Sequence, residues 1–204
     1  MLNYCLSFCP FIVYWLTCGL VSLMPENENT NTKIINQIDK NTVLISTMIS
    51  TLLTCLLNIL IVYNEILNTS ILRYYYILVG VWWIDTFEYF LHVALHKINF
   101  LYKHAHKTHH TLYNPYHYGA LYNSTCESIL ESSILLSGIY FLGFSYQEYI
   151  ITITLGHFAT VIDHTFLNYK NKFHYLHHSK NGNYNFQQPF FTYYDKLFGT
   201  YKIN

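Results

Sequence analysis

Histidines in this sequence gather into three short patterns whose spacing suits metal binding. The patterns are His92-Val-Ala-Leu-His96, His106-Lys-Thr-His109-His110 and His174-Tyr-Leu-His177-His178. Residues three and four positions apart share one face of a helix, so each pattern is expected to aim two or three imidazoles at a common point. Neutral imidazole binds iron, copper, nickel and zinc. Eight convergent histidines exceed the ligand set of one tetrahedral zinc ion, and they suit two metal ions with positions left open for oxygen.

Four further histidines accompany these patterns. His164 and His157 are seven residues apart and therefore share a helix face. His164 is expected to be a ninth ligand or a residue that supports the ligands. His157 lies about two turns deeper in an apolar stretch. It could have a functional role near the metal centre, or it could be a core histidine bonded to a neighbouring helix. His104 and His117 flank the second pattern. Each could contact the metal ligands and support them, or be a solvated loop residue.

Asp85 is the acidic residue that the spacing places best for supporting the ligands. It precedes His92 by seven residues, which puts both on one helix face. A carboxylate there can accept the free ring N–H of a ligand histidine and fix its tautomer; the alternative is an ion pair with a lysine. Glu88, four residues before His92, is a second candidate. Glu127 is expected near a helix N-terminus, where a negative charge is favourable.

The composition of the chain is that of a membrane protein. Charged residues make up 11% of it, against about 25% in soluble proteins. Apolar stretches at 5–24, 43–63 and 71–91 are each long enough to cross a bilayer, and the polar segment 25–42 is a loop. The net charge is zero, so nothing points to a nucleic-acid partner. The five cysteines form no CxxC pair and are expected to be free thiols.

Two shorter apolar stretches, 129–145 and 147–163, predict a helical hairpin. Lysines lie before it, from Lys97 to Lys107, and after it, from Lys170 to Lys202. Two crossings between these groups put both on one side of the membrane, as the positive-inside rule requires. Ten of the eleven basic residues agree with this arrangement and Arg73 does not. We therefore expect the histidine patterns to face the cytosol.

Taken together, these residues resemble the fatty acid hydroxylase superfamily, also called the sterol desaturase family. The resemblance covers about residues 10–201 and is most similar to the cholesterol hydroxylase and sterol methyl oxidase branch. Its carriers are Asp85, the three histidine patterns with Lys107 inside the second, Val161-Ile162-Asp163-His164, Asn183-Tyr184 and the tail Phe191-Thr192-Tyr193-Tyr194-Asp195-Lys196-Leu197-Phe198-Gly199-Thr200.

The resemblance implies an all-α integral membrane protein, a transmembrane helical bundle with a cytosolic, histidine-rich helical cap. Residues 1–91 would hold the membrane-spanning helices and loop, and 92–204 the catalytic region with the hairpin at 129–163. The protein would be a multi-pass protein of the endoplasmic reticulum. The family's ligand positions fall on His92, His96, His106, His109, His110, His164, His174, His177 and His178, with Asp85 and His157 expected to support them.

The same resemblance implies the cofactors and partners. Two non-haem iron ions would bind, with dioxygen as co-substrate. Electrons would come from a reduced nicotinamide through a b-type cytochrome and its reductase, and the substrate would be a lipid. Three sites depart from the family pattern, because Tyr175 replaces an Asp, Thr165-Phe166 replaces Ser-Gly, and Tyr194 replaces a Trp. No ligand position is lost, so metal binding is expected, while these changes bear on the substrate and on full activity.

Oxidation of an aliphatic C–H bond is beyond acid–base side chains and needs the metal centre. We therefore expect a lipid hydroxylase acting on a sterol or a fatty acyl chain. Desaturation at the same centre, and a lipid-binding relative without turnover, stay open as alternatives. A haem cytochrome would need histidine pairs deep in facing helices, and only His157 lies deep. A metal transporter would need polar ligands along a path through the membrane, and 43–63 carries no charge.

Overall fold

The protein is a bundle of helices in the parts of the chain that its computed structural model describes. Those parts are residues 2–24, 38–63, 72–165, 173–180, 182–187 and 190–202. The longer helices are α2 (Cys9–Ser22), α3 (Lys40–Tyr63), α4 (Tyr74–Lys97), α6 (Thr125–Phe141) and α7 (Tyr146–Asp163). The shorter ones are α1 (Leu2–Leu6), α5 (Asn99–Leu101), η1 (Tyr102–His106), η2 (His109–Thr111), η3 (His117–Gly119), α8 (Phe173–Ser179) and α9 (Tyr193–Leu197). The all-α prediction is confirmed.

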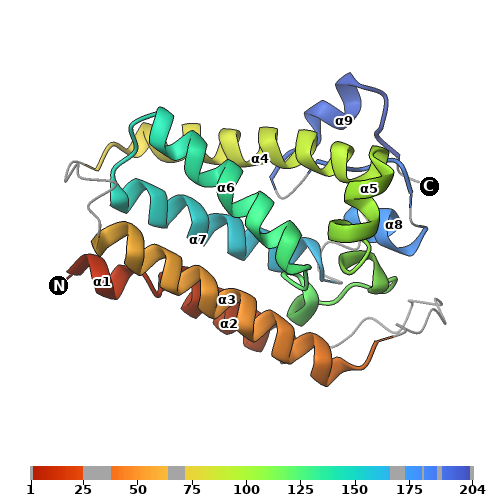
Figure 1. The fold of residues 1–204 in the computed structure, drawn as a ribbon, viewed down its shortest axis with the longest axis horizontal. Coiled ribbons are helices and arrows are strands. Elements are labelled where there is room, and N and C mark those ends of the chain that lie inside the picture. Colours follow the sequence, from red (N-terminus) through yellow and green to blue (C-terminus); the bar gives the residue numbers. More distant parts are fainter. Residues whose placement is uncertain are drawn as a thin grey trace.

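The longer helices lie side by side along the molecule, and α5, α8 and α9 gather at one end (Figure 1). Helix α7 lies between α2 and α4 and contacts both, and α4 also contacts α6. The histidine patterns therefore lie at the end of a bundle, where several helices can supply ligands to one place.

Three stretches of helix are long and apolar enough to cross a membrane, Asn3–Ser22, Lys40–Tyr63 and Tyr74–Lys97. Helix α3 leaves large apolar side chains exposed, among them Ile45 and Leu56. An apolar surface of this kind is stable when lipid covers it. The prediction of a multi-pass membrane protein is confirmed at this level.

The bounds of all three predicted spans differ from the observed helices. Helix α3 begins at Lys40, before the expected start at 43 and inside the predicted loop 25–42. The span expected at 5–24 is interrupted, because α1 ends at Leu6 and α2 begins at Cys9. Pro10 lies in the first turn of α2, where its missing N–H breaks no helical hydrogen bond. The third span, expected at 71–91, continues as one helix to Lys97, since the polar histidines end the apolar pattern without ending the backbone hydrogen bonding. Of the predicted loop 25–42, residues 25–37 lie outside the described residues.

Serine caps set the start of both hairpin helices. Ser124 accepts from the backbone N–H of Glu127 at 3.1 Å, so α6 begins four residues before the predicted start at 129. Ser145 accepts from the N–H of Glu148 at 3.2 Å, and the Glu148 carboxylate accepts from the Ser145 N–H at 2.7 Å. This reciprocal pair is a capping box. The apolar pattern alone missed the first turn of α6 because that turn is polar.

Arg73, the basic residue that disagreed with the charge pattern, lies at the opposite end of the bundle from the histidines. It immediately precedes α4, and its guanidinium donates to both carboxylate oxygens of Glu148, at 2.9 and 2.8 Å. The other end of α4 leads into α5 and the histidine region (Figure 1). Helix α4 is continuous across residues 91 and 92, so the first two histidines are part of the same rigid element as a candidate span. The division of the chain at this point stays a proposal.

Candidate metal centre

Nine histidine side chains meet at the end of the bundle where α5 and α8 lie. They come from α4, from residues 106–110, from the end of α7 and from α8. They form two groups, and within each group the candidate ligand atoms lie within 4.8 Å of one another. Cluster A is His92, His96, His106, His110 and His177; cluster B is His109, His164, His174 and His178. The structure thus brings together every histidine at which the family resemblance places a ligand.

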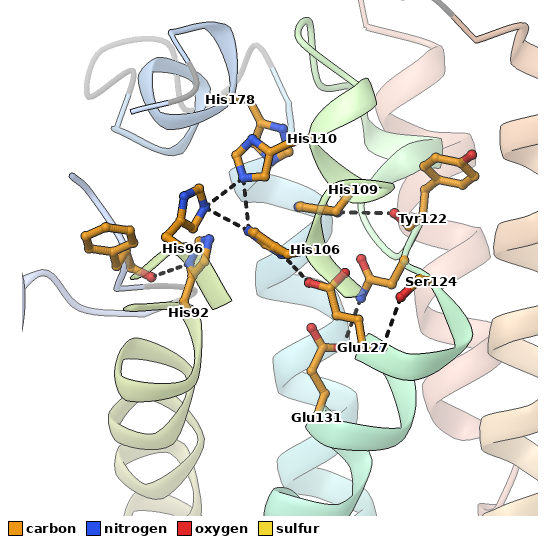
Figure 2. Close-up of polar contacts among 12 residues, drawn as sticks. His92, His96, His106, His109, His110, Tyr122, Ser124, Glu127, Glu131 and His178 are labelled. Atoms are coloured by element: carbon orange, nitrogen blue, oxygen red, sulfur yellow. Dashed lines mark hydrogen bonds and ion pairs between the residues drawn. The ribbon is translucent and has the colours of Figure 1, made fainter. Parts of the chain in front are cut away.

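In cluster A the Nε2 atoms converge on one point. Those of His96, His106 and His110 lie 2.9 Å from one another (Figure 2). The Nε2 of His177 lies 3.0 Å from that of His110. The Nε2 of His92 is buried and has no hydrogen-bond partner among the described residues.

Cluster B repeats this arrangement next to cluster A. The Nε2 of His174 lies 3.0 Å from those of His164 and His178. The ring of His109 packs against that of His178, with 4.5 Å between the ring centroids. The two clusters adjoin, since the rings of His178 and His110 are stacked at 4.8 Å.

Hydrogen bonds on the far side of the rings fix the tautomers. Six Nδ1 atoms face an oxygen acceptor and therefore carry the ring proton, which leaves the lone pair on Nε2. Lone pairs 2.9–3.0 Å apart repel each other unless a cation lies among them, so the clusters fit bound metal ions. The six pairs, at 2.5–3.2 Å, are His92 with Phe186 O, His106 with Glu127 Oε1, His109 with Tyr122 O, His164 with Thr160 O, His177 with Tyr184 O and His178 with Leu112 O.

Each HxxHH pattern divides between the clusters: two of its histidines face a common point, as predicted, and the third joins the other cluster. His106 and His110 belong to cluster A and His109 to cluster B; His174 and His178 belong to cluster B and His177 to cluster A. In the α-helix α8, positions i and i+4 are about 40° apart around the axis, whereas i+3 and i+4 are about 100° apart. The second pattern runs from the π-helical turn η1 to the 3-10 turn η2 and shows the same division. The middle histidine therefore faces a different direction and joins the other cluster.

Burial keeps these imidazoles neutral. It lowers the pKa of His109 to about 4. Burial, followed by repulsion from other cluster histidines, lowers the pKa of His177 and of His178 far below the ordinary value. Neutral imidazole is the form that binds metal ions, so these residues can act as ligands at neutral pH.

Glu127 is the carboxylate that contacts a cluster histidine directly. Its Oε1 lies 2.5 Å from Nδ1 of His106, and both side chains are buried. The expected position near a helix N-terminus is also correct, because Glu127 is in the first turn of α6. Its contact with His106 was missed because 21 residues separate the two, and no helical spacing links them.

Asp85 contacts the C-terminal segment and not a histidine ring, which corrects the direct role predicted for it. Its carboxylate accepts from the backbone N–H groups of Phe190 and Phe191, at 2.8 and 3.3 Å, and from the side-chain amide of Gln187. The acceptor for the His92 ring N–H is the carbonyl of Phe186. The spacing of seven residues put Asp85 on the correct face of α4. The segment around Phe186 and Gln187, about 100 residues later in the chain, lies between Asp85 and the ring of His92.

Asp195 completes the support of that segment. It accepts from the backbone N–H groups of Phe186 at 3.0 Å and Gln187 at 2.7 Å. Asp85 and Asp195 thus hold Phe186 and Gln187 in place, and the Phe186 carbonyl accepts from His92. The family resemblance of residues 191–200 included Asp195 but assigned it no contact.

The remaining histidines lie outside both clusters. His157 has its Nδ1 3.3 Å from the carbonyl oxygen of Pro10 and packs its ring against Tyr14. This contact favours the core histidine bonded to a neighbouring helix over support of the ligands. His104 is exposed and bonds to a backbone carbonyl one turn earlier. His117 bonds through Nε2 to a serine of α2 at 2.9 Å.

A partly open cavity of about 180 Å³ reaches the clusters. Residues of α3, α4, α6 and α7 line it, and His106 of cluster A and His109 of cluster B lie at its histidine end. Farther along the helices its walls include Leu57, Leu135 and Ile153. An apolar molecule in this cavity would therefore meet both clusters at one end.

A helical bundle with candidate membrane spans, whose cavity reaches two histidine clusters, can hold two metal ions beside an apolar ligand. Comparison with known proteins agrees. The sequence profile of the fatty acid hydroxylase family matches residues 77–200. No solved structure matches the chain.

Three curated relatives illustrate the family. Sphinganine C4-monooxygenase 2 of Arabidopsis thaliana is 30% identical over 96% of this chain and 86% of its own length. Sphingolipid C4-hydroxylase SUR2 of Saccharomyces cerevisiae is 39% identical over 61% of this chain and 39% of its own length. Very-long-chain aldehyde decarbonylase GL1-9 of Oryza sativa subsp. indica is 27% identical over 96% of this chain and 87% of its own length.

The chain belongs to the fatty acid hydroxylase family. It is accordingly an oxidoreductase, and its histidine clusters are consistent with the two-metal site typical of that family. The resemblance inferred from the histidine patterns is confirmed.

Proposed function

We propose that the chain hydroxylates carbon 4 of a sphingoid base, the long-chain amino alcohol of sphingolipids, at two iron ions held by clusters A and B. The names of the Arabidopsis and yeast relatives support the reaction. The observation that carries the proposal is that the cavity meets both clusters, through His106 and His109. A substrate chain in this cavity presents its C–H bonds where the metal ions would be held.

The donor set fits the cofactor. Five histidines of cluster A and four of cluster B are the residues that would hold the two ions. Iron bound there supplies activation of dioxygen for attack on an unactivated C–H bond, which no side chain can provide. In the balanced reaction, R–H, O2, two electrons and two protons give R–OH and water. We propose that the electrons come from a reduced nicotinamide through a b-type cytochrome and its reductase.

The residues of the chain itself orient the ligands and shield the reaction from water. Glu127 holds the ring of His106, and the Phe186 carbonyl holds that of His92. Residues of four helices line the partly open cavity, so a lipid chain bound there would displace water from the histidine end.

The substrate proposed here replaces the sterol or fatty acyl chain expected from the sequence. That expectation rested on the family resemblance of short motifs, whereas the Arabidopsis sphinganine relative matches 96% of the chain. The same relatives favour hydroxylation over desaturation. Convergence of all nine histidines favours turnover over a lipid-binding relative without activity.

We also propose that the protein resides in the endoplasmic reticulum with its clusters facing the cytosol. Lys97 ends α4 beside the histidines, Lys103 and Lys107 lie within the second histidine region, and Lys180 follows α8. Basic residues next to membrane spans favour the cytosolic side.

Expression in a host that lacks sphingoid-base C4 hydroxylation tests the proposed reaction. Mass spectrometry of the host lipids should show a sphingoid base that has gained one oxygen atom, located at carbon 4 by fragmentation. His110→Ala, which removes a ligand of cluster A, should abolish the product at equal protein level. An alkene product would favour a desaturase, and loss of a long-chain aldehyde would favour the decarbonylase chemistry. A base hydroxylated at another carbon would contradict the C4 assignment.

A further inference from the structure

The histidine end of the cavity is acidic. Glu88 of α4 and Glu127 and Glu131 of α6 line it together with Asn123. Glu127 and Glu131 are four residues apart and therefore on one face of α6. Figure 2 shows both side chains reaching from α6 toward the histidines. Among the described residues that line the cavity are three carboxylates and no lysine or arginine.

One of these carboxylates has an oxygen that nothing in the described protein binds. Glu127 is 1% exposed, and its Oε1 contacts His106. Its Oε2 is buried without a hydrogen-bond partner among the described residues, and so is Oδ1 of Asn123. Glu131 accepts from the Asn123 side chain at 3.0 Å. Buried polar atoms rarely stay unpaired, and a buried carboxylate needs a positive or hydrogen-bonding partner. A donor from a ligand in the cavity would meet this need.

The proposed substrate has such a donor at the required place. A sphingoid base carries a primary amine, a cation at neutral pH, on carbon 2. Three single bonds of about 1.5 Å link this nitrogen to carbon 4, so the two atoms are within roughly 4 Å of each other. A group that binds the amine must therefore adjoin the metal ligands. Glu127, in contact with His106 at 2.5 Å, does so.

The opposite end of the cavity is apolar and suits the hydrocarbon tail of a sphingoid base. Its walls there include Leu57, Leu135 and Ile153. A polar head among the carboxylates and a hydrocarbon tail along these residues would leave the carbons next to the head beside the clusters. The arrangement thus favours oxidation near the polar end of a lipid over oxidation in the middle of its chain.

We propose that Glu88, Glu127 and Glu131 bind the cationic amine of a free sphingoid base, so that the enzyme acts on the base before its nitrogen is acylated. This inference rests on the proposed function. N-acylation converts the amine to a neutral amide, which removes the positive charge and adds bulk at the acidic end. A free base is then the substrate, and the enzyme that acylates the base acts on the hydroxylated product.

The test compares two substrates in the metal-loaded protein in membranes, sphinganine and its N-acetyl derivative. Wild-type protein should oxidise sphinganine with the higher kcat/KM. Glu131→Gln keeps an oxygen that can accept from Asn123 but removes the charge. It should raise KM for sphinganine by roughly 10- to 100-fold, the effect of losing a charge-assisted hydrogen bond. The small activity on the N-acetyl derivative and the metal content should stay unchanged.

Glu88→Gln, on a different helix, gives a second test if Glu131→Gln folds poorly. Asp39→Asn is the matched control, because Asp39 is an exposed carboxylate that caps α3 through Thr42 and asparagine caps equally well. The control should leave KM for both substrates unchanged. An equal loss of activity on both substrates in Glu131→Gln would overturn the proposal and would indicate a structural or proton-transfer role. A wild-type preference for the N-acetyl derivative would also overturn it.

Binding of octadecylamine and of octadecanol separates this inference from the proposed function. The amine should raise the melting temperature of the wild-type holoprotein more than the alcohol does, and Glu131→Gln should remove the difference. If neither sphinganine nor its derivative is oxidised while the amine still binds selectively, the proposed function fails and the amine site stands. Equal stabilisation by the amine and the alcohol would contradict the amine site itself.

Discussion

Oε1 of Glu127 lies 2.5 Å from Nδ1 of His106, and the two side chains are buried at the junction of the cavity and cluster A. The carboxylate orients the imidazole and increases the electron density on Nε2, the atom that faces the cluster. The other five cluster histidines whose Nδ1 faces an oxygen donate to backbone carbonyls. His106 is therefore expected to be the most basic ligand of its cluster.

Glu127→Gln should weaken metal binding at cluster A by about 10- to 100-fold, the usual cost of losing such a carboxylate partner. Glutamine retains the size of the side chain, so the helix should stay intact. Competition with a metal chelator, followed by metal analysis, measures the change. Asp39→Asn is the control for loss of one negative charge. Equal metal retention in wild type and Glu127→Gln would show that the contact does not tune the ligand.

His109→Ala should remove the metal of cluster B, and His110→Ala that of cluster A, because adjacent histidines of one pattern belong to different clusters. The wild-type protein should hold two ions per chain and each variant about one. Total metal analysis is the measurement, since expression in a heterologous host can load zinc in place of iron. His104→Ala should retain both ions, because His104 is exposed and lies outside both clusters. Loss of metal in His104→Ala as complete as in His109→Ala would require the second histidine region to be reassigned.

Asp195→Asn should destabilise the segment that holds His92. The Asp195 carboxylate is fully buried and accepts from two backbone N–H groups and from Thr200. Loss of charge-assisted bonds at a buried site costs about 1–3 kcal/mol. A lower melting temperature together with partial loss of metal is expected. Thr200→Val, which removes one donor and keeps the carboxylate, should have the smaller effect. The prediction is wrong if Asp195→Asn melts like wild type.

Lys103 and Lys180 should be accessible from the same face of the membrane, the cytosolic one. Single cysteines at these positions, in a background without the native cysteines, should react with an impermeant reagent in sealed microsomes. Tyr63, 72% exposed at the far end of α3, is the control position, where a cysteine should react only after the membrane is opened. Labelling of Lys103→Cys and Lys180→Cys from opposite sides would mean that the helices carrying the clusters cannot meet.

Eight of the nine clustered histidines and the helical bundle could be predicted from sequence because both follow local rules, whereas the family resemblance pointed to His164. Box histidines repeat at helical intervals, and apolar runs of about 20 residues indicate spans. The partners of the ligands could not be predicted in this way. Glu127 reaches His106 and Asp195 reaches Phe186 through the packing of elements that are distant or irregular in the chain. The division of each HxxHH pattern between clusters depends on which other histidines pack against it from either side. The spacing within one pattern does not show this.

The continuity of α4 fixes the depth of the reaction relative to the bilayer. A helix of 24 residues is about 36 Å long, against about 30 Å of hydrocarbon. Starting at Tyr74, the hydrocarbon therefore ends close to His92, and His96 lies one turn beyond it. A lipid can then reach the clusters by lateral diffusion without leaving its leaflet. The rate of turnover should follow the mole fraction of substrate in the membrane surface, and dilution with inert phospholipid should slow the enzyme even when the amount of substrate in the sample is constant.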